Sequence, residues 1–345
     1  MAAPIFIVST GRCGSTMLSN MVRCHRSLLS ISEFFTSLGA YAFRGGVMTG
    51  AAVARRLGTL SPAGRALLEN GLHVDEFLYP LGPGARYGAG EVPPILCTTL
   101  PHLTEDHERL WDELAAALSG RGSAPLGEHY RFVFDWLAER FGRSVWLERS
   151  GASLLFVPTL ARLYPDARFV HIYRDGRDTA LSMRRHHFFR LRVQMAELLH
   201  RVGLDPMAPF NVPGTSPWVP AAERLRFGFF DAERYRRMEI PLPAFGRFWS
   251  EMIERGLGYL AALPEERVLS LRYEDVVAEP EAELRRFIRF VGPDLEADSW
   301  LAEVSALPNA KAPAWQSLEA SELAALERAC SPGQRLLGYL PAGGA

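Results

Sequence analysis

Short apolar runs rich in β-branched residues recur along the chain, and most are followed by a stretch with the spacing of a helix. Runs of this length and composition are typical of strands buried on both faces of a sheet. They predict strands over residues 5–8, 28–31, 145–147, 168–173 and 267–271. Helices are predicted over 16–22, 128–141, 154–163, from 179 onward, 244–263 and 281–291. The strand-then-helix order favours an α/β fold with a parallel sheet covered on both faces.

Two stretches interrupt this order. Residues 34–127 are rich in Gly, Pro and Ala, with helical patterns only near 51–57 and 105–118. Residues 184–243 mix basic residues, aromatic residues and several prolines, and we predict that they are irregular. Because their internal signals are weak, we interpret both stretches as insertions in a single domain that spans residues 1–345.

The composition is that of an ordinary globular protein, with 345 residues, 48% of them hydrophobic and 22% charged. A net charge of −1 argues against a protein that binds nucleic acid or a membrane surface, because such proteins usually have a basic excess. Lys311 is the only lysine among 38 basic residues. The arginine excess reflects either compositional bias or the suitability of arginine for bidentate contacts to phosphate and sulfate.

Cysteine usage and the apolar pattern bear on location. The four cysteines are far apart and form no C-x-x-C pair, so we expect neither a metal site nor a disulfide framework. The N-terminal residues lack the pattern of a signal peptide, and no run of 18 apolar residues occurs. We therefore expect a cytoplasmic protein without a membrane partner.

The first candidate site is the segment STGRCGST, residues 9–16, between the first predicted strand and helix. Gly11 and Gly14 allow backbone N–H groups to turn inward, and a helix N-terminus adds partial positive charge, so the loop is expected to bind an anion. Arg12 supplies a formal charge, and Ser15 and Thr16 supply hydroxyl donors. The alternative is a plain strand-to-helix turn, which often needs only one glycine.

Two enzyme classes with similar loops are excluded by single residues. A Walker A motif requires lysine where this chain has Ser15. A cysteine-dependent phosphatase loop requires arginine six residues after the cysteine, where this chain has Ser19. Cys13 is therefore interpreted as a small packing residue of the loop and not as a nucleophile.

The second candidate site follows the strand predicted over 168–173. Arg174 comes directly after this strand, at the sheet edge where α/β proteins bind ligands. Ser182 lies eight residues further, in the following helix, so that the two side chains are placed to hold one phosphate. The alternative is that Arg174 pairs with Asp175 or Asp178 in a surface turn.

Together these segments resemble the PAPS-dependent sulfotransferase superfamily, whose donor is 3′-phosphoadenosine 5′-phosphosulfate (PAPS). A third matching segment is RYED at 272–275, followed by Glu279, Pro280 and an amphipathic helix. The RDGR sequence at 174–177 is more similar to the tyrosylprotein and bacterial small-molecule branches than to the cytosolic phenol-type branch. The resemblance covers residues 4–33, 145–185 and 245–292, and the loops between them are expected to bind the acceptor.

The resemblance implies a P-loop-like parallel sheet and PAPS as co-substrate, without a metal. It assigns the 5′-phosphosulfate to the loop residues Gly11, Arg12, Cys13, Gly14, Ser15 and Thr16. The 3′-phosphate is assigned to Arg174 and Ser182. Tyr273 stands where the family often has an adenine-side residue, or is a core tyrosine at a strand end. Lys311 belongs either to a basic loop that closes over the donor or to the exposed surface.

The resemblance also bears on the catalytic base. The phenol-type branch uses a histidine after the third strand, and this chain has Gly151 at that position, so this base is not carried over. The tyrosylprotein-type branch uses a glutamate after the second strand, where Glu33 stands. The alternative for Glu33 is a helix-start carboxylate or a structural ion pair. His102, in the first insertion, is the competing base.

Arg149 lies 25 residues before Arg174, which matches the spacing of a lysine in the tyrosylprotein-type branch. We expect Arg149 and Arg12 to stabilise the charge that develops around the bridging oxygen and the sulfuryl group. The alternative is a salt bridge between Arg149 and the adjacent Glu148. Alternation of side chains along a strand weakens that alternative.

The sequence thus predicts transfer of a sulfuryl group to a hydroxyl or amine of a small metabolite or carbohydrate. Residues 184–243 are a candidate acceptor pocket, or else a partly ordered cover or an oligomer contact; they include His186, His187, Phe188, Phe189 and Trp218. One rival function is a P-loop nucleotide or sugar kinase, which would need a Walker lysine and an acidic Mg²⁺ ligand. The other is a catalytically silent nucleotide-binding protein of the same fold.

Overall fold

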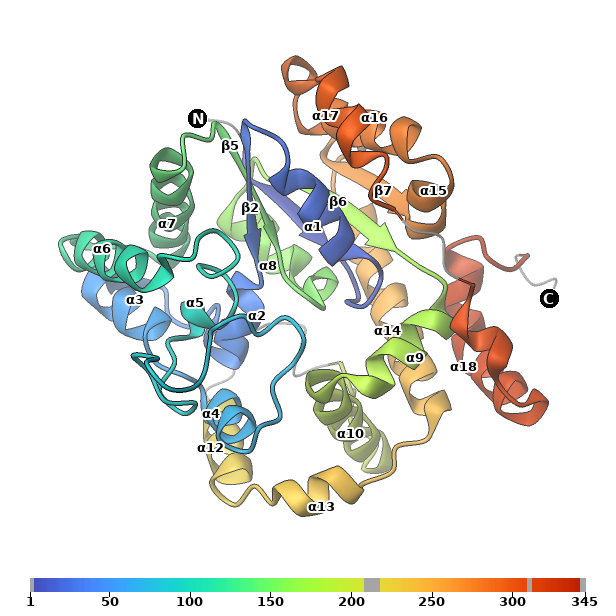
Figure 1. Ribbon diagram of the computed structural model, residues 1–345. Coiled ribbons are helices and arrows are strands. Elements are labelled where there is room, and N and C mark those ends of the chain that lie inside the picture. Colours follow the sequence, from blue (N-terminus) through green and yellow to red (C-terminus); the bar gives the residue numbers. More distant parts are fainter. Residues whose placement is uncertain (1–2, 208–217, 309–311, 342–345) are drawn as a thin grey trace. The chain divides into compact units, whose positions relative to one another are not determined.

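The computed structural model describes residues 3–207, 218–308 and 312–341 (Figure 1). Five strands form a parallel sheet in the order β2-β5-β1-β6-β7, and helices flank it. The strands are β1 (Ile5–Val8), β2 (Leu28–Ser32), β5 (Val145–Arg149), β6 (Arg168–Tyr173) and β7 (Val268–Arg272). Each of them coincides with a predicted apolar run, and the predicted α/β class with a P-loop-like parallel sheet is confirmed.

The chain folds as two compact units, each built from separated stretches. The first unit holds the described residues of Met1–Ser27, Gly151–Ala208 and Glu239–Ala345. The second unit holds those of Leu28–Ser150 and Pro209–Met238. The interpretation of the chain as one domain with two insertions stays a prediction.

In the first unit, β1 pairs with β6 and β6 pairs with β7, all in parallel. All four residues of β1 are buried because they are apolar on both faces, as a central parallel strand requires. Phe6 packs against Phe169 and Tyr164, with ring centroids 5.9 and 5.4 Å apart. His171 of β6 is also fully buried, and burial lowers its pKa to about 4, so the imidazole is neutral.

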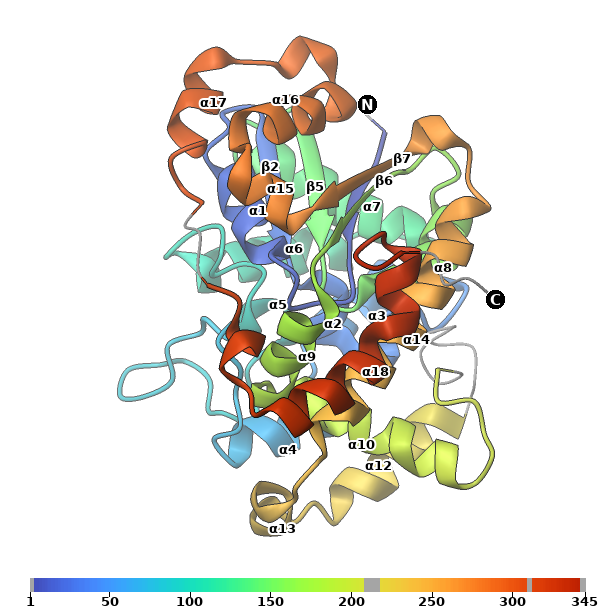
Figure 2. The same ribbon diagram turned by 90° about the vertical axis from the view of Figure 1, so that its right-hand side faces the viewer.

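Long helices complete this unit, and α9, α14 and α18 lie together, as Figure 2 shows. The fully buried Trp249 of α14 fills the space beside Gly176 of α9 and Gly333 of α18, where a Cβ would lie 2.3 and 2.6 Å from its ring. The α-helices of the unit are α1 (Ser15–Arg23), α8 (Val157–Leu163), α9 (Gly176–Arg185), α10 (His187–Arg201), α14 (Leu242–Ala261), α15 (Tyr273–Ala278), α16 (Pro280–Val291), α17 (Asp298–Val304) and α18 (Ala320–Leu336). Its short 3₁₀ helices are η2 (Ser153–Phe156), η3 (Glu265–Arg267), η4 (Pro293–Leu295) and η5 (Ala314–Ser317).

In the second unit, β2 pairs with β5 in parallel, and β3 (Val47–Thr49) forms an antiparallel pair with β4 (Ser123–Pro125). Phe34 lies at the centre of an aromatic core, with ring centroids 4.8 Å from Phe134 and 5.1 Å from Tyr130. The helices are α2 (Phe34–Leu38), η1 (Gly39–Tyr41), α3 (Gly50–Leu57), α4 (Pro62–Glu69), α5 (Pro94–Cys97), α6 (His107–Ser119), α7 (Leu126–Arg140), α12 (Trp218–Gly228) and α13 (Ala232–Arg237).

The prediction that residues 184–243 are irregular is wrong over the part that the structure describes. Helices α10, α12 and α13 occupy most of it. The prolines that suggested irregularity lie mainly between α10 and α12 or at the start of a helix. Helix α10 buries Phe189, Leu191, Val193 and Ala196, a helical spacing that the basic residues between them obscure.

Among the helices of the described residues, none is both long and apolar enough to cross a bilayer. The cytoplasmic location and the absence of a membrane partner stay predictions.

Two glycines of α14 provide a test of the packing in the first unit. At Gly256 a Cβ would lie 2.2 Å from Cγ of Leu154, whereas at the exposed Gly258 it would meet no atom within 4 Å. We expect Gly256→Ala to lower the free energy of unfolding by about 1–3 kcal/mol through overpacking. The matched Gly258→Ala change should raise it by up to about 1 kcal/mol, because alanine favours the helix. Urea denaturation measures both, and equal effects of the two changes would contradict the described contact.

Candidate functional site

The loop between β1 and α1 is a tight turn that requires glycine at two positions. Gly11 and Gly14 have φ values of 80° and 92°, in the left-handed region that favours glycine. The Ser9 hydroxyl accepts a hydrogen bond from the Gly11 amide at 3.1 Å and tightens the turn. Gly14 is the N-cap residue of α1 and has no side chain to occupy the first amides of that helix. The positive end of α1 therefore faces the loop, as binding of an anion requires.

The side chains of the loop divide into buried and accessible groups. Cys13 is fully buried, and its thiol lies 3.3 Å from the carbonyl of Ile172 in β6. Burial raises the pKa of this thiol, which fits a packing residue better than a nucleophile. Ser15 is buried, Arg12 is half-buried and Thr16 is exposed.

The two predicted phosphate-binding segments meet in the first unit. Arg12 Nε donates a hydrogen bond to Ser182 Oγ at 3.1 Å, which joins the loop after β1 to α9. Arg174, directly after β6, donates through Nη2 to Asp178 at 2.9 Å. This pair is the alternative that the sequence left open for Arg174. The structure adds that Nε of Arg174 is buried and has no hydrogen-bond partner within the described residues, which leaves a donor for a ligand oxygen.

Tyr273 joins the same group of side chains. It is the first residue of α15, directly after β7, and it is half-buried. The guanidinium of Arg174 lies over its ring, 4.6 Å from the centroid. A Cβ at Gly14 would lie 2.2 Å from Cδ2 of this ring. Tyr273 thus contacts both the loop and Arg174, and its adenine-side role stays a prediction.

In the second unit, Glu33 and Arg149 form a buried ion pair. Arg149 ends β5 and donates through Nη1 to the Glu33 carboxylate and through Nη2 to Ser32 Oγ at 2.8 Å. The exposed fractions of Glu33 and Arg149 are 7% and 3%. The partner of Arg149 is thus Glu33 and not the adjacent Glu148, and the alternative of a Glu148 salt bridge is wrong. The roles of both residues in catalysis stay predictions.

Behind this pair lies a second buried carboxyl that the sequence analysis did not select. The exposed fraction of Glu148 is 1%, and its Oε1 accepts a hydrogen bond from Ser150 Oγ at 2.6 Å. The pKa of Glu148 is raised to about 8, chiefly by burial and further by the charge of Glu33, while Ser150 and Arg149 oppose the shift. The signal available in the sequence was its position beside Arg149, directly after the strand predicted over 145–147, and the structure shows that all five residues of β5 are buried.

Strained backbone conformations occur in the loops that follow β1, β2 and β5. Three non-glycine residues of the described chain have positive φ: Arg12 at 59°, Glu33 at 55° and Ala152 at 57°. Each follows a strand closely, after β1, β2 and β5 respectively. Such conformations cost roughly 1–3 kcal/mol each and occur often at functional sites. The strain therefore supports these strand ends as the functional part of the chain.

The structure places the remaining candidates as follows. His102 is buried in the second unit, after α5. Phe189 is buried, and its ring lies where a Cβ at Gly11 would come within 2.5 Å, so it packs against the loop, and its place in an acceptor pocket stays a prediction. His186 and Phe188 form an aromatic group with Phe189. Lys311 and the Trp218 side chain lie outside the described residues.

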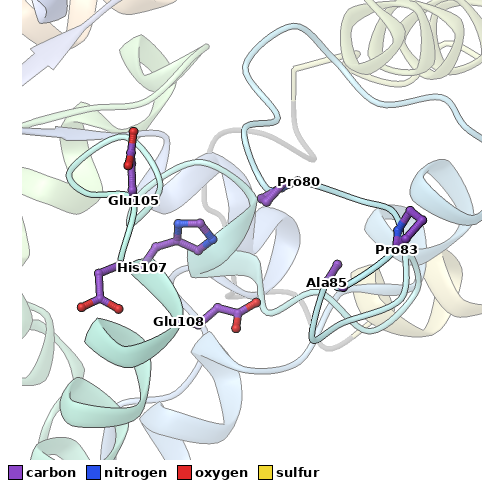
Figure 3. Close-up of a pocket in the computed structure, with 8 residues that line it drawn as sticks. Pro80, Pro83, Ala85, Glu105, His107 and Glu108 are labelled. Atoms are coloured by element: carbon purple, nitrogen blue, oxygen red, sulfur yellow. The ribbon is translucent and has the colours of Figure 1, made fainter.

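A separate cavity of about 400 Å³ lies in the second unit (Figure 3). Its lining includes Glu105, Asp106, His107 and Glu108, and none of the predicted site residues belongs to it. Three carboxylates disfavour an anionic ligand there. In the described part of the chain, no group of three or more His, Cys, Asp or Glu side chains is placed to hold a metal ion.

Comparison with known proteins identifies the family. The model of the sulfotransferase family matches residues 95–212 and 222–297, which is more than half of the chain. The chain belongs to the sulfotransferase family. Arg149, Arg174, Ser182 and Tyr273 lie within the matched residues of this sulfotransferase, and the loop after β1 and Glu33 precede them.

Individual relatives are more distant. Carbohydrate sulfotransferase 7 of Mus musculus is 29% identical over 198 residues, which cover 52% of this chain and 39% of that protein. This sulfotransferase thus spans well under half the length of that relative. The sulfotransferase domain from the curacin biosynthetic pathway is 15% identical with a TM-score of 0.49, and 99% of both chains are covered. Sulfotransferase STF9 from Mycobacterium avium is 14% identical with a TM-score of 0.44, covering 99% of this chain and 78% of that one.

The buried Glu148 predicts a pH dependence of stability. Its pKa is about 8 in the folded protein against an ordinary value of 4.5, so between these values the folded protein holds a proton that the unfolded chain has released. The free energy of unfolding therefore falls as the pH rises through this window. Gln cannot ionise, so we expect the Tm of Glu148→Gln to fall less than that of the wild type between about pH 6 and pH 8. Calorimetry at several pH values measures the Tm of each protein, and Glu128→Gln, at an exposed glutamate, serves as the control. If the Tm of the wild type and the Tm of Glu148→Gln change with pH in parallel, the raised pKa of Glu148 is contradicted.

Proposed function

We propose that this chain transfers a sulfuryl group from PAPS to a hydroxyl or amine of a small acceptor, with Glu33 as the base. The observation that carries the proposal is the group of side chains formed by Arg12, Ser182, Arg174 and Tyr273 in the first unit. It combines an anion-binding turn with two guanidiniums, as a donor with phosphate groups at two positions requires.

The residues present fit this donor. The turn at Gly14 leaves the α1 N-terminus open to a phosphosulfate, and Arg12 lies in the same loop. Arg174 retains a buried donor in Nε, and its pairing with Asp178 uses only Nη2 among the bonds described above. We assign the 5′-phosphosulfate to the loop after β1 and the 3′-phosphate to Arg174 and Ser182. The 3′-phosphate is the group that distinguishes PAPS from an ordinary adenylate.

The proposed chemistry is an in-line displacement at sulfur. PAPS supplies the activated sulfuryl group. The acceptor oxygen forms a bond to sulfur while its proton passes to the Glu33 carboxylate, and the bond from sulfur to the phosphate oxygen breaks with its electron pair on the phosphate. We assign to Arg12 and Arg149 the role of stabilising the negative charge that develops around the departing oxygen. Arg149 has a further role, because its ion pair orients the carboxylate of Glu33.

A carbohydrate is the acceptor class that we favour. The support is that the mouse relative is named as a carbohydrate sulfotransferase. A kinase is disfavoured because the residue directly after β6 is Arg174, which suits a phosphate, whereas a kinase would need an acidic ligand for Mg²⁺ there.

Donor binding is tested by the thermal shift that adenosine 3′,5′-bisphosphate produces. A ligand at 100 times its Kd stabilises the fold by about 2.7 kcal/mol. We expect Arg174→Ala to weaken binding of the bisphosphate about 10- to 100-fold by removing a charge-assisted contact, and to leave binding of adenosine 5′-monophosphate unchanged. Arg184→Ala, in the helix α9 that follows Arg174, is the control, because Arg184 pairs with Glu322 instead. Stabilisation by ATP–Mg²⁺ alone would favour the kinase.

The base is tested by Glu33→Gln, which keeps the size of the side chain. We expect kcat for transfer of ³⁵S-labelled sulfate to a panel of sugars to fall about 10²- to 10⁴-fold, because the proton acceptor is lost. The Kd for adenosine 3′,5′-bisphosphate should stay unchanged. The control is Glu128→Gln, an exposed glutamate of the same unit. Full turnover in Glu33→Gln would contradict the role of Glu33 as the base. If the wild type binds adenosine 3′,5′-bisphosphate but transfers no sulfate, the catalytically silent nucleotide-binding protein is favoured.

A further inference from the structure

The start of α2 raises the question of which group caps it. Glu33 is the N-cap residue of this helix, the position whose side chain ordinarily accepts hydrogen bonds from the second and third helical amides. The Glu33 side chain makes no such bond. Instead, the amides of Phe35 and Thr36 donate to Ser150 Oγ at 3.0 and 3.2 Å. A residue that follows β5 therefore caps a helix that follows β2.

The hydroxyl of Ser150 is itself fixed. Two amide donors take up both of its lone pairs, so its single hydrogen is left to donate to Oε1 of Glu148 at 2.6 Å. Both side chains are buried, with 0% and 1% exposed. The second oxygen of Glu148, Oε2, is buried without a hydrogen-bond partner within the described residues, which is a costly position for a polar atom.

The Glu33 carboxylate has two potential partners, the first amides of α2 and the guanidinium of Arg149. Its backbone is held in the left-handed region by the bond from its amide to the Arg149 carbonyl at 2.7 Å, and by the burial of Phe34 and Phe35 directly after it. With the helix already capped, its carboxylate pairs with Arg149. Without the Ser150 hydroxyl, the amides of Phe35 and Thr36 would lose this acceptor and would attract the Glu33 carboxylate, because an N-cap side chain ordinarily accepts from these two positions.

We propose that Ser150, oriented by Glu148, is a positioning residue for the base: it caps α2 in place of Glu33 and so keeps the Glu33 carboxylate on Arg149 and ready to accept a proton. This inference rests on the proposed function, in which Glu33 is the base. Glu148 acts through Ser150 and touches no substrate.

Ser150→Ala tests the proposal. We expect kcat to fall about 100-fold, the loss that a misplaced catalytic group produces. The KM for PAPS and the Kd for adenosine 3′,5′-bisphosphate should be unchanged, because the residues assigned to the two phosphate ends of the donor, Arg12, Arg174 and Ser182, are left in place. Ser150→Thr keeps the hydroxyl and should restore most of the turnover. The matched control is Ser37→Ala in the same helix, whose hydroxyl donates to the Phe34 carbonyl and accepts none of the first amides.

A double change separates positioning from a general loss of structure. In the Glu33→Gln background the base is already absent, so adding Ser150→Ala should lower the residual kcat by less than twofold. If Ser150→Ala does not fold, Glu148→Leu gives the same measurement, because it removes the acceptor that orients Ser150 without touching the hydroxyl. Its effect on kcat should likewise vanish in the Glu33→Gln background.

The outcomes are distinct. Transfer by the wild type with equal kcat in Ser150→Ala would overturn the positioning role and leave the proposed function standing. Equal losses from Ser150→Ala with and without Glu33 would also overturn it, because they would show a merely structural effect. A wild type that binds no adenosine 3′,5′-bisphosphate and transfers no sulfate would overturn both the function and the inference.

Discussion

The burial of a parallel sheet on both faces is the constraint on which the rest of this structure depends. Its central strands are mostly apolar, so most of the candidate polar residues lie at the strand ends. Each of the five strands reaches a candidate residue at its carboxyl end: the loop of Gly11 after β1, Glu33 after β2, Arg149 at the end of β5, Arg174 after β6 and Tyr273 after β7. These positions are also where α/β proteins bind their ligands.

Local signals account for what the sequence predicted. The five strands and the helices around residues 16–22, 128–141, 244–263 and 281–291 follow from apolar runs and helical periodicity, which depend on neighbouring residues. Glycines at 11 and 14 pointed to a turn because their conformations require them. Helix α10 was missed because arginines lie between its buried apolar residues, and its helical form depends on tertiary burial.

Distant partners account for what the sequence did not predict. The Ser150 cap of α2 joins residues more than a hundred positions apart, and no local pattern encodes such a bond. The sequence analysis allowed an ion pair at Glu33 but did not name Arg149 as its partner. Burying an ion pair costs several kcal/mol per ion unless other hydrogen bonds compensate, and Ser32 supplies one to Arg149. Such an arrangement is weak evidence for stability and stronger evidence for a required orientation.

The separated stretches of the two units affect how the chain is made on the ribosome. Ile5 of β1 pairs with Arg168 of β6, so the first strand to be synthesised must wait for a partner made much later. At 5–20 residues per second this wait is roughly 10–30 seconds. During that time an apolar segment meant for the centre of a sheet is without one of its two neighbouring strands. We therefore expect nascent chains that end before residue 168 to depend on chaperones more than the finished protein does.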